Sequence, residues 1–368
     1  MTDYNGKIVD MHCDTISGLL ALKEQGEPEG LRQNNRHIDL LRMKESRYLI
    51  QNFALFVPLK SVSDPWEQVC SLYRLYQEEL EQNRDILAPV LCFSDIQKNE
   101  AEGRLSSLLT VEEGGVCKGE PEKLRELYQM GVRMMTLTWN FVNEIGHPNL
   151  NSSRYAEKVK SVMEAWKNCD SHVSAQEREE KRQAAEAAFA GYYHTPDLTG
   201  GLTEKGREMV AEMEKLGMIP DVSHLSDAGF YDVLEATGKP FVASHSNARA
   251  VCPCVRNMTD DMIRKLSERG GVMGLNFCAD FLEEKPLGER NPGTIAAVVR
   301  HAKHIVSVGG IEVLGLGSDF DGIHTHEELP GAQSMDRLWS ALCAAGFSED
   351  QAEKIFWRNV LRVYRDTL

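Results

Sequence analysis

The sequence has 368 residues, 42% of them hydrophobic, which is enough for a large core and fits either one α/β barrel or two average domains. With 41 basic and 56 acidic residues, the net charge is −15, so we expect neither nucleic acid nor a membrane surface as a partner. The nine cysteines are scattered, and neither a signal peptide nor a membrane-spanning run stands out. We therefore expect a cytoplasmic protein.

Eight apolar, β-rich segments recur along the chain, with room for a helix between most of them. We predict strands at residues 7–12, 48–57, 107–112, 133–138, 218–223, 240–244, 272–277 and 313–317. Helices are expected between them, for example at 124–130 and 203–216. Strands that alternate with helices predict a parallel sheet, and eight of them predict a (β/α)8 TIM barrel, in one domain over residues 1–368.

One connection is much longer than a barrel needs. Some 64 residues separate positions 138 and 203, where a loop of a few residues would suffice. Residues 155–189 are rich in Ala, Glu, Lys and Arg, so we expect one or two charged helices there, as an insertion over 152–195 after the fourth strand. A solvated hairpin on the surface and a lid or subunit contact both agree with this pattern.

The first predicted strand ends in a histidine and an acid. His12 and Asp14 are two residues apart, so on a strand they point to the same face, while Cys13 points to the helix layer. In TIM barrels the chemistry lies at the C-terminal ends of the strands. Imidazole and carboxylate at such an end suit a divalent ion such as zinc, and a buried His–Asp pair without metal is the alternative.

Further candidate ligands end the third, fifth and sixth predicted strands. Glu112 and Glu113 are adjacent, so only one of them should face the barrel axis, where a carboxylate could bridge two ions; a turn or capping acid is the alternative. His224 and His245 each follow a serine at the ends of neighbouring strands. Neighbouring strands lie about 4.8 Å apart, so both imidazoles could reach one ion.

Three charged residues near strand ends suggest roles in catalysis or substrate binding. Asp319 lies nearest the tip of the last strand and is our candidate for general acid or base, while Asp321 is expected to brace the same Gly-rich turn. Arg256, in the loop after the sixth strand, could hold a substrate carboxylate with two parallel hydrogen bonds. A surface salt bridge is the alternative for Arg256.

Several strings in this order resemble the membrane dipeptidase (renal dipeptidase) family, the M19 metallopeptidases of the amidohydrolase superfamily. They are VDMHCDT at 9–15, LRELYQMGVRMMTLT at 124–138, DVSHLS at 221–226, SHSNARAVCPCVRN at 244–257, GLGSDFDG at 315–322 and NVLRV at 359–363. The resemblance covers nearly the whole chain and implies a (β/α)8 barrel with two zinc ions.

The resemblance also implies a role for each candidate ligand. His12 and Asp14 would bind one zinc ion, His224 and His245 the other, and Glu112 would bridge the two. The reaction would be hydrolysis of a dipeptide's amide bond by a metal-bridging hydroxide, and family habit suggests a homodimer.

By the same resemblance, Asp319 would handle the proton and Arg256 would hold the C-terminal carboxylate of the dipeptide. Two alternatives stay open. One is another binuclear-metal amidohydrolase acting on lactones, cyclic amides or phosphoesters, and the other is a barrel that binds metal without catalysis.

The chain departs from the family just after the fourth predicted strand. Well-studied members carry a histidine there that is proposed to contact the substrate carbonyl, and this chain has Trp139. Tryptophan offers one indole N–H and does not titrate. Help for the developing oxyanion would then come from zinc, from Asn140 or from Asn143, and we include Trp139 and Asn140 among the expected substrate contacts.

Overall fold

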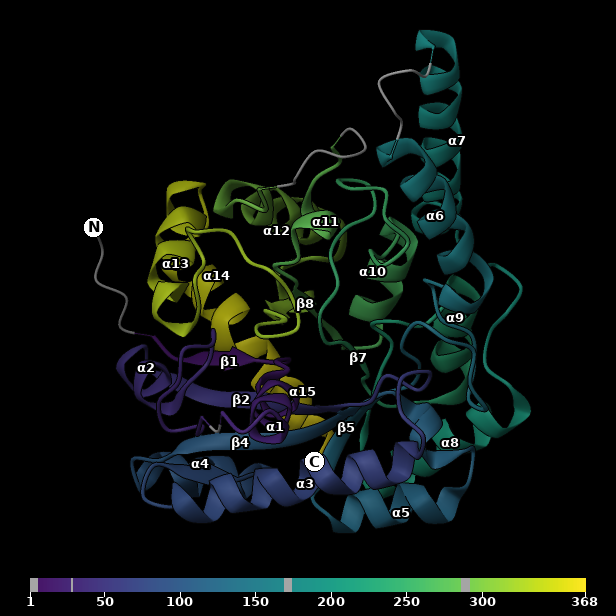
Figure 1. Cartoon of the computed structure of the whole chain (residues 1–368). Helices are drawn as coiled ribbons and strands as arrows, with labels where there is room; N and C mark the ends of the chain where they lie inside the picture. Colours follow the sequence, from purple (N-terminus) through teal and green to yellow (C-terminus); the bar gives the residue numbers. More distant parts are fainter. Residues whose placement is uncertain (1–5, 28, 169–173, 286–291) are drawn as a thin grey trace.

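The computed structural model describes residues 6–27, 29–168, 174–285 and 292–368, and within them the parallel strands form a closed barrel (Figure 1). Their order in the sheet is β2-β1-β9-β8-β7-β6-β5-β4-β3, and a further pairing of β2 with β4 closes the circle. The strands are β1 Ile8–Asp10, β2 Tyr48–Phe56, β3 Leu87–Pro89, β4 Leu105–Glu112, β5 Val132–Thr136, β6 Ile219–Asp221, β7 Val242–Ala243, β8 Val272–Leu275 and β9 Leu314–Leu316.

Helices surround this barrel (Figure 1). They are α1 Thr15–Glu24, α2 Leu40–Glu45, α3 Pro65–Gln82, α4 Phe93–Ala101, α5 Pro121–Gln129, α6 Ser152–Lys167, α7 Ala175–Tyr193, α8 Glu204–Leu216, α9 Asp227–Ala236, α10 Asp260–Glu268, α11 Ala279–Leu282, α12 Ile295–Gly309, α13 Met335–Ala344, α14 Glu349–Glu353 and α15 Asn359–Thr367, with 3-10 turns at Gly114–Cys117, Ile311–Val313 and Ala332–Ser334 and a π turn at Lys354–Arg358. None of the helices in the described ranges combines the length and apolar character needed to cross a bilayer.

The predicted TIM barrel is confirmed, with one strand that the sequence did not predict. This strand, β3, pairs with residues 105–107 at the start of β4. β5 pairs with the same edge of β4, but further along, at residues 109–112. Because β3 has three residues and ends in Pro89, it falls below the length at which an apolar run signals a strand.

The strands that precede His12, His224, His245 and Asp319 are shorter than predicted, whereas β4, which ends in Glu112, starts two residues earlier than predicted. β1 stops at Asp10, whose carboxylate accepts a hydrogen bond from the backbone N–H of His12 at 3.3 Å. β6 stops at Asp221, which does the same for the N–H of Ser223 at 3.0 Å. Since a side chain, and not the neighbouring strand, satisfies these N–H groups, the regular strands end two residues before His12 and three residues before His224.

The barrel has two apolar cores. One lies between the strands and the surrounding helices, and the other fills the barrel interior, with members such as Ile219 and Val272. Val360, Val363 and Tyr364 of α15 belong to the interior core, so this last helix packs its apolar face onto the barrel. Burial on both faces explains why β2 reads as a nearly continuous apolar run.

The long connection after β5 forms the expected charged helices. In Figure 1 α6 and α7 stand away from the barrel as a pair. The end of α7 is tied to the barrel side, because the backbone N–H of Val255 donates to the carbonyl of Tyr193 at 2.7 Å. The insertion therefore contacts the loop that leads to Arg256.

Candidate metal centre

Glu112 lies at the centre of the candidate site. It is the last residue of β4, is 3% exposed and points toward three histidines. Its Oε2 lies 3.4 Å from Nε2 of His12, whereas its Oε1 lies 3.1 Å from Nε2 of His224 and 3.6 Å from Nε2 of His245. Oε2 thus faces His12, whereas Oε1 faces His224 and His245. Burial raises the pKa of Glu112 to about 7.

Glu113, the neighbouring acid, turns away from the histidines. Its backbone is left-handed, with φ 111°, and its carboxylate accepts hydrogen bonds from the N–H groups of Gly115 at 2.7 Å and Trp139 at 3.1 Å. Asn143 donates to the same carboxylate at 2.5 Å. Glu113 therefore holds the loop after β5 against the end of β4, and burial raises its pKa to about 7.

His12 and Asp14 follow β1 on the other side of Glu112. His12 Nε2 is 3.5 Å from Asp14 Oδ2. Both His12 Nε2 and Asp14 Oδ1 are buried, and neither has a hydrogen-bond partner among the described residues. Because a buried polar atom without a partner is costly, these atoms call for a ligand that accepts lone pairs.

His224 and His245 face each other, with their Nε2 atoms 3.0 Å apart. The Nδ1 of His224 lies 3.1 Å from Oδ1 of Asn140, and the Nδ1 of His245 lies 2.7 Å from Oγ of Ser244. Burial lowers the pKa of both rings well below the usual value, and the next cause is the charge of Arg256 for His224 and that of His12 for His245. Both imidazoles are therefore neutral, which is the form that binds metal.

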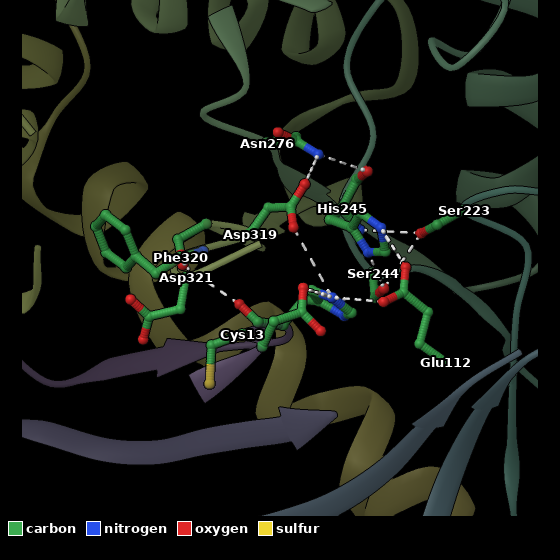
Figure 2. A network of polar contacts seen from close by, with 12 residues as sticks. Cys13, Glu112, Ser223, Ser244, His245, Asn276, Asp319, Phe320 and Asp321 are labelled. Atoms are coloured by element: carbon green, nitrogen blue, oxygen red, sulfur yellow. Dashed lines mark hydrogen bonds and ion pairs between the residues drawn. The ribbon is translucent and has the colours of Figure 1, made fainter. Parts of the chain in front are cut away.

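Asp319 reaches the same site from the turn after β9 (Figure 2). Its Oδ1 lies 3.9 Å from Nε2 of His12, and its Oδ2 accepts a hydrogen bond from Asn276 at 2.9 Å. Burial raises its pKa to about 6. The backbone of Asp319 is left-handed, with φ 62°, as is that of Asp321, with φ 70°, so the turn is strained and must be held by its surroundings.

Asp321 supplies that support. Its carboxylate accepts hydrogen bonds from Oγ1 of Thr15 at 2.6 Å and from the N–H of His37 at 2.7 Å. Figure 2 shows its side chain directed away from that of Asp319. The structure thus gives Asp321 bracing contacts, in line with the sequence prediction.

These residues could hold a metal ion. Two overlapping sets, both containing His12, have donor atoms that lie within 4.8 Å of one another inside each set: His12, Glu112 and His245, and His12, Asp14 and Asp319. Imidazole and carboxylate donors suit zinc, and manganese or cobalt as well. Asp319 was expected only as a proton carrier, and its place among the possible ligands is a finding of the structure.

A cavity of about 330 Å³ opens beside this centre. Acids and one histidine of the centre line part of it, and half-buried apolar side chains line much of the rest. Its walls include Asp14, Glu112, His224, Asp319, Phe56, Trp139, Asn140, Phe281 and Ile323. Trp139 packs edge-on against Phe56, with ring centroids 4.9 Å apart, and lies 6.3 Å from His224. The expected substrate contacts Trp139 and Asn140 are thus at the cavity.

Arg256 does not line this cavity. It is 1% exposed, and its guanidinium donates to the carbonyls of Ser223 and, at 3.2 Å, His245. It also donates to Oγ of Ser246 at 3.4 Å and lies 3.1 Å from a ring nitrogen of His224 and 5.2 Å from the ring centroid of Phe281. Phe281, which contacts the guanidinium, lines the cavity where Arg256 does not, and burial lowers the pKa of the guanidinium.

Sequence reasoning missed the buried acids that organise the strand ends. Asp10 and Asp221 are the last residues of β1 and β6, and both are almost fully buried. A signal was available, because an aspartate stands two residues before His12 and three before His224. An acid at the buried end of an apolar strand requires donors, and here serines of neighbouring strand ends supply them.

Comparisons with known proteins identify the family of this chain. The sequence profile of the membrane dipeptidase family (peptidase family M19) matches residues 4–174 and 177–367. An uncharacterized protein from the pqqA 5′ region of Klebsiella pneumoniae is 30% identical over 84% of this chain and 98% of its own length. An uncharacterized dipeptidase of Schizosaccharomyces pombe is 29% identical over 99% of this chain and 81% of its own length.

Solved structures share the fold. A metallopeptidase from Rhodobacter sphaeroides, liganded with a phosphinate mimic of the dipeptide L-Ala-D-Ala, superposes with a TM-score of 0.79 at 24% identity, over 98% of this chain and 99% of that one. The profile match over both halves of the barrel settles the family, and the resemblance seen in the sequence is confirmed: this chain belongs to the membrane dipeptidase family, peptidase family M19.

Proposed function

We propose that this metal-dependent dipeptidase works with two zinc ions held on either side of Glu112. His12 and Asp14 would hold one ion, and His224 and His245 the other. The observation that carries the proposal is the position of the Glu112 carboxylate, whose two oxygens approach different histidines. A bridging carboxylate has this arrangement in paired metal sites.

When bound, such ions lower the pKa of a shared water and polarise the carbonyl of the scissile amide. Asp319 then serves as the proton carrier, taking the proton at one carboxylate oxygen and giving it to the leaving amine. The hydrogen bond from Asn276 fixes the orientation of Asp319, and burial keeps its pKa near 6, which suits a group that must accept and release a proton near neutrality.

The cavity beside the centre would hold the substrate. Its volume of about 330 Å³ suits a small peptide, and the dipeptide mimic bound by the Rhodobacter sphaeroides relative supports a dipeptide. Phe56, Trp139 and Phe281 offer apolar contacts to the side chains, and Asn140 offers its amide. Arg256 remains the candidate for holding the C-terminal carboxylate, which requires a rearrangement because the guanidinium is buried and does not line the cavity.

Zinc, cobalt and manganese content, measured together with turnover, is the first test. Purified enzyme should contain about two ions per chain, lose activity on chelation and regain it on adding zinc. A panel of dipeptides, including D-residue forms, should be hydrolysed in preference to lactones, cyclic amides and phosphoesters. Metal-free protein with full activity, or a clear preference for lactones, would rule the proposal out.

We further propose that the protein is a single barrel domain and forms a homodimer in the cytoplasm. Light scattering of the purified protein tests the dimer, limited proteolysis tests the single domain, and cell fractionation tests the compartment.

A further inference from the structure

A buried carboxylate connects three strand ends underneath two of the candidate ligands. Asp221, at the end of β6, is 1% exposed. Its Oδ2 accepts hydrogen bonds from Oγ1 of Thr136 and Oγ of Ser244, both at 2.6 Å. Its Oδ1 accepts from Oγ of Ser223 at 2.7 Å and from the backbone N–H of Ser244 at 2.8 Å. β5, β6 and β7 are thus joined through one side chain.

The hydrogen bond between Ser244 and Asp221 determines which atom of the serine faces His245. A carboxylate accepts and does not donate, so at 2.6 Å the hydroxyl proton of Ser244 must lie toward Asp221. Ser244 Oγ then presents only lone pairs to Nδ1 of His245, 2.7 Å away. Nδ1 therefore carries the ring proton, and the lone pair of His245 is placed on Nε2, which faces Glu112 and His224. Because Arg256 donates to Nε2 of His224, the two Nε2 lone pairs then face each other at 3.0 Å, an arrangement that a cation bound between them would relieve.

The alternative arrangement of protons is unfavourable. Ser244 Oγ also lies 3.2 Å from Oγ of Ser223, so its proton could in principle point there. Two bare oxygens, those of Ser244 and Asp221, would then face each other at 2.6 Å with no proton between them. Ser223 donates to Asp221 as well, and its oxygen accepts from the backbone N–H of His245 at 3.0 Å, so it does not set the ring proton.

We propose that Asp221 and Ser244 are positioning residues that fix the tautomer and the orientation of His245 and so tune the affinity of one of the two metal sites. The inference rests on the proposed function, because it assigns His245 as a ligand. Histidine ligands commonly donate their second ring N–H to a carboxylate or to another oxygen acceptor, and loss of that acceptor typically lowers metal affinity by about 10- to 100-fold. Here a serine hydroxyl stands between the carboxylate and the ring.

Ser244→Ala, Asp221→Asn and the control Ser223→Ala test the proposal in the full-length protein. Nitrogen–proton correlation NMR of the metal-free protein reads the tautomer of His245 directly, and competition with a chelating dye gives the zinc affinity. In wild type and Ser223→Ala, the proton should lie on Nδ1. In Ser244→Ala it should shift toward Nε2, and zinc binding to one of the two sites should weaken by about 10- to 100-fold.

Asp221→Asn offers a second route. An amide at this place can donate to Ser244 Oγ, which frees the hydroxyl proton to point toward Nδ1 of His245. The proton of His245 should then move to Nε2 even though Ser244 is present. If Ser244→Ala and Ser223→Ala show the same His245 tautomer and the same zinc affinity, the inference is wrong.

The tautomer of His245 is measured in metal-free protein. Failure of the positioning role can therefore be distinguished from failure of the proposed function. A wild type that binds no zinc would overturn the metal assignment but leave the tautomer measurement meaningful. A wild type that binds two zinc ions, together with a Ser244→Ala variant that keeps the Nδ1 proton, would overturn only the positioning role. Circular dichroism and thermal unfolding of each variant confirm that the barrel is folded.

Discussion

The two halves of the candidate metal centre contain the same kind of ligand in opposite electrostatic environments. Burial alone would lower the pKa of His12, but the carboxylates of Glu112 and Asp14 outweigh it and hold this pKa well above its usual value. Burial, aided by Arg256, keeps the pKa values of His224 and His245 well below it. The comparison teaches that nearby charge, and not burial alone, decides the state of a buried histidine.

The halves also differ in how their rings are oriented. The Nδ1 atoms of His224 and His245 are hydrogen-bonded to Asn140 and Ser244. On the other side, charge dominates, with Asp14 and Asp319 within 4 Å of the His12 ring. The half that contains His12 would attract a cation through its carboxylates. The half that contains His224 and His245 would bind a cation through ring lone pairs that are already oriented.

The variant Glu112→Gln should have the largest effect, because it removes the carboxylate that both halves of the candidate centre share. We expect loss of at least one metal ion per chain and a fall of dipeptide turnover to background, measured by elemental analysis and an amine-release assay. The matched control is Glu113→Gln, an adjacent buried acid that faces away from the histidines.

Glu113→Gln should keep its metal while losing about 1–3 kcal/mol of stability, because charged hydrogen bonds to the loop after β5 are weakened. If Glu112→Gln retained both ions and normal turnover, the bridging assignment would have to be abandoned.

Asp319→Asn should have the next largest effect, and it tests the half that contains His12. An amide cannot take up the proton, so kcat should fall by about 10²- to 10⁴-fold while both ions stay bound. Loss of metal in this variant would make Asp319 a ligand in its own right, as its distance of 3.9 Å from His12 allows. Turnover close to that of wild type would remove it from the mechanism altogether.

Proton release on zinc binding sharpens the contrast between the halves. The raised pKa keeps His12 protonated at neutral pH without metal, and zinc requires the neutral ring, so binding there should release the His12 proton together with a fraction of a proton from the shared Glu112, whose pKa is about 7, whereas His224 and His245 should release none. Titration calorimetry in buffers of different protonation enthalpy measures this.

The raised pKa of His12 also makes the stability of the metal-free protein depend on pH. A raised folded-state pKa means that the contribution of His12 to the stability of the metal-free protein is present at low pH and is lost as the pH rises through that raised value. Thermal unfolding of chelated protein across this pH range should show the loss, and Glu112→Gln should reduce it. An unchanged pH profile in Glu112→Gln would contradict the charge argument.

The sequence indicated which residues meet, but not how they are held. His12 and His224 were predicted because a barrel brings the C-terminal ends of its strands to one rim, whereas the choice of Glu112 over Glu113 came from the family resemblance. The short strand β3 and the burial of Arg256 against the ends of β6 and β7 could not be predicted, since both depend on contacts between different segments of the chain. The bond from Asp221 to Ser244 is likewise invisible without the register of β6 and β7.

Trp139 gives the smallest expected effect, and it concerns only the half that contains His224. Its indole packs on Phe56 at the cavity, 6.3 Å from His224, and is half-buried. Replacing it with alanine should lower kcat/KM for dipeptides with large apolar side chains by roughly tenfold and leave Gly-Gly little changed, because only the former bury surface against the ring. Metal content should stay at the wild-type level.

Two further substitutions separate the apolar face of Trp139 from its N–H group. Trp139→Phe keeps a flat apolar ring without a donor, and Trp139→His keeps a donor with less apolar surface. If side-chain contact dominates, Trp139→Phe should stay near wild type with a Phe- or Leu-containing dipeptide, and Trp139→His should resemble Trp139→Ala. The reverse order, with histidine active and phenylalanine impaired on every dipeptide including Gly-Gly, would instead make the indole N–H a donor to the substrate carbonyl. Trp139 would then act on the reacting carbonyl beside His224 and would not select among substrate side chains.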